Sequence, residues 1–302
     1  MFQHIKISLN HWADSFVKRD KALRLFEICL SVWVIFHAFK IYSIRGLLTS
    51  EYGFCSPYSG VYPLGLSPDL LSPLIKKYFY PLILVQVGIA ASIIFRPSNM
   101  VARLVLWSSS VCMLTACDSI IDGGTILLRI ILFLYIFCDA KGIEKSRSDP
   151  YQKWLFCLLV LSMQMQIVFV YIQASISKIR ADAWVDGVAM YYILQIPEYA
   201  NQAITQYLLE HDWILVSVAY GTIFFQALFA FAMTSRILRP FWLAVGVCLH
   251  LAIAFTMGLF TFGMLMIIFY ILFLSNRDVE KIVMFLKPKN SMWPKLKPLI
   301  KV

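Results

Sequence analysis

The chain has 302 residues, of which 60% are hydrophobic and 15% are charged, and its formal net charge is +10. Soluble domains average about 45–50% apolar and about 25% charged residues, so this composition excludes a soluble globular protein. The positive charge does not indicate nucleic-acid binding, because no basic stretch is interleaved with stacking aromatics on a soluble module. We attribute the charge to membrane topology and to attraction by anionic lipid headgroups.

The apolar residues come in blocks long enough to cross a bilayer, which takes about 20 residues in a helix. We therefore predict an all-α, polytopic membrane helical bundle that forms a single transmembrane domain over residues 1–302. No cleavable signal is expected, since the first block begins near Leu25 behind a polar, basic tail (1–22) and no small-residue cleavage site follows it. The predicted spans, about eight in number, are 23–43, 78–95, 101–121, 124–138, 154–177, 213–233, 240–257 and 259–274.

The distribution of basic residues predicts the orientation. If both termini are cytoplasmic, the inner segments, including a basic tail at 276–302, hold 20 of the 27 lysines and arginines. This asymmetry favours cytoplasmic N and C termini. Tight turns are predicted at Arg96-Pro97 and Arg239-Pro240, because proline cannot continue the preceding helix.

Two outer loops, about 44–77 and 178–211, are long and mix apolar and aromatic residues with proline and glycine. We expect short helices at the outer interface there rather than extended tails. Each loop follows the first helix of a four-helix half, which hints at a 4+4 duplication without a residue-level repeat. Cys55 and Cys117 can both face the oxidising side, so a disulfide between them is left open.

The fifth predicted helix carries a polar stripe. At about 100° per residue, Gln164, Tyr171, Ser175 and Lys178 fall on one narrow face, which Asp182 continues if the helix persists. Polar groups inside a membrane need partners, so this face is expected to look into the bundle or a water-filled cavity. Lys178 either anchors the helix end at the outer headgroups or, desolvated in an apolar pocket, acts as a general base or nucleophilic amine.

Three further ionisable residues lie within apolar segments. His250 is mid-span in GVCLHLAIAF, where it is either functional or a neutral histidine hydrogen-bonded to a neighbouring helix. Arg129 needs a counter-charge, for which Asp118 and Asp122 are candidates, although it can also hold an anionic substrate. Glu27 is expected to be a capping or helix-packing group. The five histidines have no ligand spacing, so we expect no zinc site.

Three segments resemble the HTTM superfamily, the membrane domain shared with vitamin K-dependent gamma-carboxylases. They are YIQASISKIRADAWVDGVAMYY (171–192), DGGTILLRIILFLYIF (122–137) and GVCLHLAIAFTMGLFTFGMLMIIFYILFL (246–274). The first has the family pattern of a helix, a lysine (Lys178), a short gap, Trp184, two residues, Gly187 and paired aromatics including Tyr191. The resemblance implies that Lys178 is a catalytic base on the outer side, that Trp184 and Gly187 shape the loop beside it, and that His250 is the family's late-helix histidine.

The chain departs from the carboxylases in two respects. It has one residue more between its lysine pair and its tryptophan, and we expect no extracytoplasmic β-rich domain. Glutamate carboxylation is therefore not implied. The length is instead similar to that of the small bacterial members that act, beside a small partner protein, in maturation of the sporulation-delaying type of secreted peptide toxin.

These resemblances lead to the expectation of a plasma-membrane maturation factor, an enzyme acting at the outer face on an exported peptide. Its partners would be that peptide, membrane lipids and a small protein, and the resemblance alone implies a quinone-like lipid cofactor. Lys178 and His250 would be catalytic; the expected cavity residues are Tyr171, Ser175, Trp184, Gly187, Tyr191, Arg129 and Gln164. The alternatives are a non-catalytic peptide- or lipid-binding scaffold or immunity protein, and a small-molecule transporter, which usually has paired broken helices and mid-membrane acidic residues.

Overall fold

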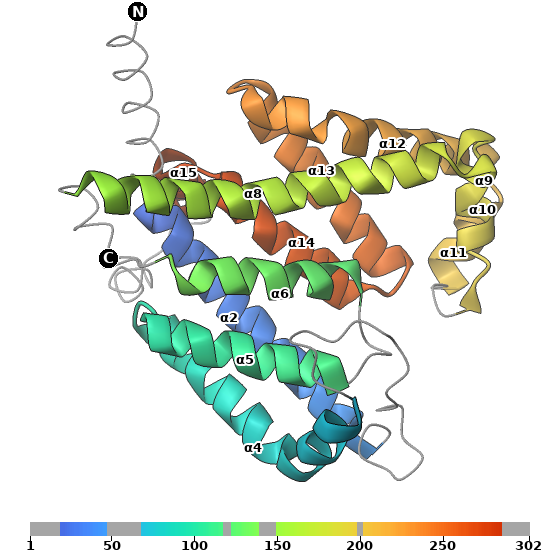
Figure 1. Cartoon of the computed structure of the whole chain (residues 1–302). Helices are drawn as coiled ribbons and strands as arrows, with labels where there is room; N and C mark the ends of the chain where they lie inside the picture. The colour runs from blue at the N-terminus through green and yellow to red at the C-terminus, as the bar shows by residue number, and fades with distance from the viewer. Residues whose placement is uncertain (1–18, 47–67, 117–121, 139–148, 198–201, 286–302) are drawn as a thin grey trace, which may run out of the picture. The chain divides into compact units, whose positions relative to one another are not determined.

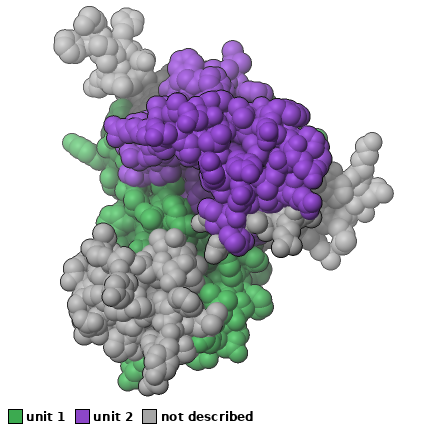
Figure 2. Space-filling model, turned by 90° about the vertical axis from the view of Figure 1, so that its right-hand side faces the viewer, with its two compact units in different colours: residues 1–163, 274–302 green, residues 164–273 purple. Residues whose placement is uncertain are grey.

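The fold is taken from a computed structural model that describes residues 19–46, 68–116, 122–138, 149–197 and 202–285. Within these ranges every regular element is a helix, in agreement with the predicted all-α class. The chain divides into two compact units, which Figure 2 shows in different colours. Unit 1 comprises residues 1–163 and 274–302, and unit 2 comprises residues 164–273.

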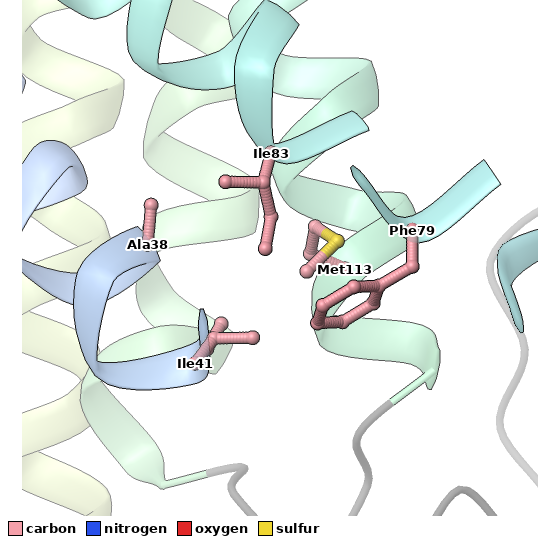
Figure 3. Packing of buried hydrophobic residues seen from close by; sticks show 5 residues of the cluster. All are labelled: Ala38, Ile41, Phe79, Ile83 and Met113. Carbon is pink, nitrogen blue, oxygen red and sulfur yellow. The ribbon is translucent and has the colours of Figure 1, made fainter. Parts of the chain in front are cut away.

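Unit 1 is built from helices that pack in chain order. They are α2 (Asp20–Ser43), α4 (Pro68–Phe95), α5 (Met100–Ala116), α6 (Gly123–Ile136), the first part of α8 (Pro150–Ile179) and α15 (Asn276–Phe285). Helix α2 lies against α4, α4 against α5, and α5 against α6 (Figure 1). Between α2, α4 and α5 lies a small apolar core, shown in Figure 3, whose members are Ala38, Ile41, Phe79, Ile83 and Met113.

Unit 2 contains the rest of α8 and the helices that follow it. They are α9 (Asp182–Val185), α10 (Ala189–Ile193), α11 (Gln202–Leu209), α12 (Asp212–Thr234), α13 (Leu238–Thr256) and α14 (Phe260–Tyr270), extended by a 3-10 turn, η4 (Ile271–Phe273). Helix α12 packs on α13, α13 packs on α14, and α9, α10 and α11 each contact α12. The short helices expected in the outer loop at 178–211 are therefore present.

Each of the eight predicted apolar segments contains a helix, but not all of these helices reach the 18 described residues that a candidate membrane span requires. Five helices meet the requirements of length and apolar composition: α2, residues Lys77–Phe95 of α4, α8, α12 and α13. The remaining three predicted spans contain shorter apolar helices, Met100–Met113, Gly123–Ile136 and Phe260–Phe273. Helix α4 is kinked at Tyr78, so the helical residues before it belong to the predicted loop at 44–77. Cys55 and Cys117, the candidate disulfide, lie outside the described residues.

One local prediction is wrong. The turn at Arg96-Pro97 lies between α4 and α5 as predicted, but Arg239-Pro240 lies in the first turn of α13. Proline is tolerated there because the first N–H groups of a helix have no partner within the helix. The predicted tail at 276–302 begins with a helix, since its first ten residues form α15.

A buried polar network joins α2, α5 and α6. Arg24 and Glu27 of α2 form an ion pair at 2.9 Å, and both side chains are buried. Glu27 also accepts hydrogen bonds from the Tyr135 hydroxyl, at 2.6 Å, and from Ser98 in the turn between α4 and α5. Arg103 donates to the Ser98 hydroxyl at 2.7 Å. Glu27 is thus a packing group, as predicted, and a single carboxylate connects three helices.

The same arginines also bind the carboxyl ends of two helices. The positive-charge asymmetry assigns Arg24 and Arg103 to the inner segments, whereas both are buried, at 3% and 1% exposed. Arg24 donates to the carbonyls of Ile93 and Ile94 at 2.7 and 2.8 Å, and Arg103 donates to the carbonyl of Tyr135 at 3.2 Å. The last carbonyls of a helix lack partners within the helix and carry partial negative charge, so a guanidinium satisfies both needs.

Helix α15 holds the start of α2. The Asn276 side-chain oxygen accepts from the backbone N–H groups of Lys21 and Ala22 at 3.0 and 3.2 Å, and its amide donates to Asp20 at 2.6 Å. The Lys21 ammonium pairs with Glu280 at 2.5 Å. A residue near the end of the chain therefore does for α2 what an N-cap side chain usually does from within its own helix.

Candidate functional site

Three of the four residues of the polar stripe of α8 are buried inside unit 2, and Lys178 is half-buried. Tyr171 and Ser175 are 2% and 3% exposed, and Gln164 is buried as well, with its amide donating to the carbonyl of Leu272 at 2.6 Å. Ser175 has no side-chain hydrogen bond to any described residue. The stripe therefore faces protein, as expected for polar groups within a membrane helix.

Tyr171 is the centre of a chain of three hydrogen-bonding side chains. Its hydroxyl lies 2.8 Å from Nε2 of His250 on α13 and 2.5 Å from the hydroxyl of Tyr270 on α14. The rings of Phe225 and Phe229 of α12 pack on Tyr171, with centroids at 5.6 and 4.4 Å. His250 is 3% exposed, and its Nδ1 has no hydrogen-bond partner among the described residues. The mid-span histidine is therefore both hydrogen-bonded to a neighbouring helix and left with one unsatisfied nitrogen.

Two glycines make this arrangement possible. A Cβ at Gly246 would lie 2.5 Å from the Tyr270 hydroxyl, and one at Gly263 would lie 2.5 Å from the backbone carbonyl oxygen of His250. Cβ atoms are not found that close to other heavy atoms, so only glycine lets α13 and α14 approach each other here.

Gly263→Ala is expected to destabilise unit 2 by about 1–3 kcal/mol, because the added methyl meets backbone that cannot rotate away. Thermal unfolding of the purified protein in detergent measures the effect. Gly221→Ala is the matched control: Gly221 lies in α12 with nothing within 4 Å of the added Cβ. That change is expected to be neutral or stabilising by up to about 1 kcal/mol. Equal melting temperatures for the two variants would contradict the close approach.

Lys178 lies at the end of α8, under the loop that follows. Its ammonium nitrogen is 4.8 Å from the centre of the Trp184 ring, and Lys178 makes no ion pair with any described residue. The helix ends at Ile179, and Asp182 begins α9 with an exposed side chain. The polar stripe therefore does not continue to Asp182.

Gly187 fixes the path of this loop. Its φ is +78°, which L side chains rarely adopt, and a Cβ would lie 3.3 Å from atoms of Tyr220 and Val216 on α12. The Tyr220 hydroxyl donates to the carbonyl of Val185 at 2.7 Å. The segment carrying Trp184 is therefore attached to α12, which keeps the indole ring over Lys178.

Seven of the nine site residues predicted from sequence fall into two groups. Tyr171, Ser175, His250 and Gln164 lie in the buried part of unit 2, while Lys178 at the end of α8 lies beside Trp184 and Gly187 in the segment that follows it. Lys178 lies seven positions after Tyr171, which is about 10 Å along a helix axis, so the lysine is not part of the Tyr171 chain of hydrogen bonds.

The other two predicted residues are not brought into either group. Tyr191 of α10 is 42% exposed and packs edge-on against Tyr192. Arg129 is a half-buried residue of α6 in unit 1. Asp122, its candidate partner, accepts from the backbone N–H of Thr125 at 2.7 Å as the N-cap of α6, and Asp118 lies outside the described residues.

Tyr270 is a site residue that the sequence did not reveal. It lies in FTFGMLMIIFYILF, which is apolar on every side, so no polar periodicity marks it. One signal was available: a buried tyrosine hydroxyl needs a partner, and a glycine on the adjacent predicted helix can admit it.

The part of the chain that holds both groups of site residues matches a known protein family. Residues 123–277 match the HTTM domain. The chain is 26% identical over 167 residues to the sporulation-delaying protein SdpB of Bacillus subtilis (strain 168), which is 51% of either chain. It is 25% identical over 195 residues to the uncharacterized protein YitO of the same organism, covering 58% of this chain and 60% of that protein.

The chain thus spans about half the length of the first of these relatives and three fifths of the second. No solved structure gives a significant match. The matches confirm the resemblance drawn from the three sequence segments, and together with the five long apolar helices they identify a membrane protein.

Proposed function

Because the HTTM match covers just over half of its residues, the chain belongs to the HTTM family, and we propose that it matures an exported peptide toxin at the outer face of the plasma membrane. In this proposal it is an enzyme in which Lys178 acts as the base. Its partners are the peptide and a small protein that acts beside it.

The proposal rests on one observation. The lysine, tryptophan and glycine that match the family pattern lie together at the end of α8 and in the segment that follows it. Lys178 lies under Trp184 without an acidic partner among the described residues, and Gly187 and Tyr220 hold the loop in place. An anchoring lysine needs no such loop, since it only has to reach the headgroups. A lysine that works on a substrate needs a fixed position.

The proposal is tested by mass spectrometry of secreted peptides from wild-type cells, a deletion strain and the deletion strain complemented with the gene. A peptide whose mass or processing changes in the deletion and returns on complementation supports a maturation role. Identical peptides in all three strains would exclude it.

A second candidate is a non-catalytic binder of a peptide or lipid, and the contact between Lys178 and Trp184 favours it. A cation over an indole ring is stabilised as a cation, and a permanent positive charge suits the binding of a carboxylate or phosphate. If the protein is such a binder, Lys178→Arg preserves function, because arginine keeps the positive charge. If Lys178 is a base, the same variant loses function, because arginine stays protonated.

The resemblance also implies a quinone-like lipid, which would supply oxidising or reducing equivalents. The residues of unit 2 are compatible with such a group. A buried imidazole nitrogen without a partner among the described residues, beside aromatic rings, is a setting that holds a carbonyl oxygen, and a quinone carbonyl and a peptide oxygen would be alternative occupants of it.

We further propose that both termini are cytoplasmic and that the chain crosses the membrane eight times. Asn276 caps the start of α2, so the first and last described helices meet on one side, which supports an even number of crossings. Five crossings would be odd, and at least one of α5, α6 and the α14–η4 segment must then cross as well. The excess of basic residues in the inner segments points to the cytoplasmic side.

Single cysteines at Asp182 and Glu280, both exposed, test this topology in a cysteine-free background. A membrane-impermeant maleimide is expected to label position 182 in intact cells and position 280 only after permeabilisation. Labelling of both positions in intact cells, or of neither, would contradict the proposed orientation.

A further inference from the structure

We propose that Tyr270 and Tyr171 hold His250 in the tautomer with hydrogen on Nδ1, so that this N–H donates to an acceptor oxygen of the bound molecule. In the proposed function that oxygen is a carbonyl or carboxylate of the exported peptide. The identity of the peptide rests on the proposed function, whereas the tautomer does not.

The direction of the hydrogen bonds follows from counting donors in the chain. Each tyrosine hydroxyl has one hydrogen, and a neutral imidazole has one N–H. If Tyr270 donates to Tyr171 and Tyr171 donates to Nε2 of His250, Nδ1–H is the only group of these three side chains left without a partner among the described residues. If the bonds run the other way, the Tyr270 hydrogen and the Nδ1 lone pair are both unsatisfied among the described residues. The first arrangement leaves fewer buried groups without partners and is therefore favoured.

A charged imidazolium does not fit the surroundings of His250. The histidine is 3% exposed, and no described acidic residue pairs with it. The neighbouring rings are those of Phe262 and Tyr270, with centroids at 5.6 and 5.8 Å. A buried charge without a counter-ion is more costly than a buried neutral donor. With the imidazolium and the tautomer with hydrogen on Nε2 both disfavoured, we assign His250 the neutral form with hydrogen on Nδ1.

The unsatisfied N–H calls for an acceptor. A buried N–H group without a partner is rare in proteins, and in apolar surroundings a donor of this kind binds an oxygen more strongly than it does in water. Donation by Tyr171 to the opposite nitrogen withdraws electron density from the ring and strengthens the Nδ1–H donor further. Tyr270 and Tyr171 are thus positioning residues, and His250 is the group that touches the bound molecule.

Nitrogen-15 NMR of the full chain in lipid nanodiscs, with labelled histidine, tests the tautomer. The His250 signals are assigned by their loss in His250→Gln. The form with hydrogen on Nδ1 is expected to exceed the other by roughly tenfold or more, since leaving one more buried group unsatisfied is disfavoured to that extent. Tyr171→Phe should bring the ratio of the two tautomers close to that of a free histidine. Tyr270→Phe should leave the form with hydrogen on Nδ1 in excess. Wild-type protein with hydrogen mainly on Nε2 would overturn the assignment, whatever the variants do.

A pair of substitutions tests the donor role. The amide nitrogen of an asparagine at position 250 lies as many bonds from Cα as Nδ1 does, and that of a glutamine as many as Nε2. At matched protein levels, His250→Asn is expected to retain at least about tenfold more peptide maturation than His250→Gln, because only the former restores the free donor. Equal activities would overturn the donor role and leave water as the partner of Nδ1. If wild-type and deletion strains secrete identical peptides, the proposed function and the peptide oxygen fail together, and the nitrogen shifts alone decide the tautomer.

Discussion

Lys178→Met is expected to reduce peptide maturation by about 100-fold or more at unchanged protein level, since a positioned general base contributes factors of about 10² to 10⁴. Methionine keeps an apolar chain of similar length against the Trp184 ring, so the loop should remain in place. The variant removes only the nitrogen. Mass spectrometry of secreted peptides, with membrane levels of the protein measured in parallel, gives the result.

Two matched variants separate the roles of this lysine. Arg180→Met removes one positive charge from the same end of α8 at an exposed position, and it should leave maturation unchanged if Lys178 is more than an anchor. Lys178→Arg keeps the charge but cannot release a proton near neutral pH, so it should be as inactive as Lys178→Met. An active Lys178→Arg would rule out the base and favour the binder. A defect in Arg180→Met as large as that in Lys178→Met would indicate anchoring by charge.

Glu27→Ala is expected to destabilise unit 1 by about 3–5 kcal/mol, the usual result of removing one partner of a buried ion pair. The change leaves the Arg24 guanidinium buried without its carboxylate and takes the acceptor from Tyr135 and Ser98. The loss is measured by unfolding of the purified protein in detergent or lipid.

Ser31→Ala is the control, because Ser31 lies one turn further along α2 and is equally buried, yet makes no side-chain hydrogen bond to a described residue. It should change stability by less than about 1 kcal/mol. Glu27→Leu combined with Arg24→Leu is expected to be less destabilising than Glu27→Leu alone, since no unpaired charge remains at Arg24. A double variant worse than the single one would mean that the bonds from Arg24 to the end of α4 matter more than the ion pair.

The helices were predictable because each apolar block is one element, and the stripe at Gln164, Tyr171 and Ser175 was predictable because helical periodicity needs no tertiary information. The partners were not predictable. Tyr171 meets residues 79 and 99 positions away in the chain, and periodicity does not determine which helices become neighbours.

The roles of two of the counted basic residues were not predictable for a related reason. Arg24 and Arg103 lie near helix ends, where basic residues usually face headgroups. Their sequence neighbours do not reveal that these arginines bind backbone carbonyls, and Arg24 also a carboxylate, inside the protein. The start of α13 at Leu238 was missed because proline suits both a turn and a first helical turn.

The bond between Asn276 and the first turn of α2 has a consequence for biogenesis. The amide groups of Lys21 and Ala22 are translated early, and the side chain that accepts from them follows 254 or 255 residues later. At about 5–20 residues per second, that interval lasts roughly 13–50 s. Throughout it, the amide groups at the start of α2 depend on water or lipid headgroups for hydrogen-bond partners. The contact between α15 and the start of α2 therefore forms only after residue 276 has been synthesised, and a nascent chain stalled before that residue lacks it.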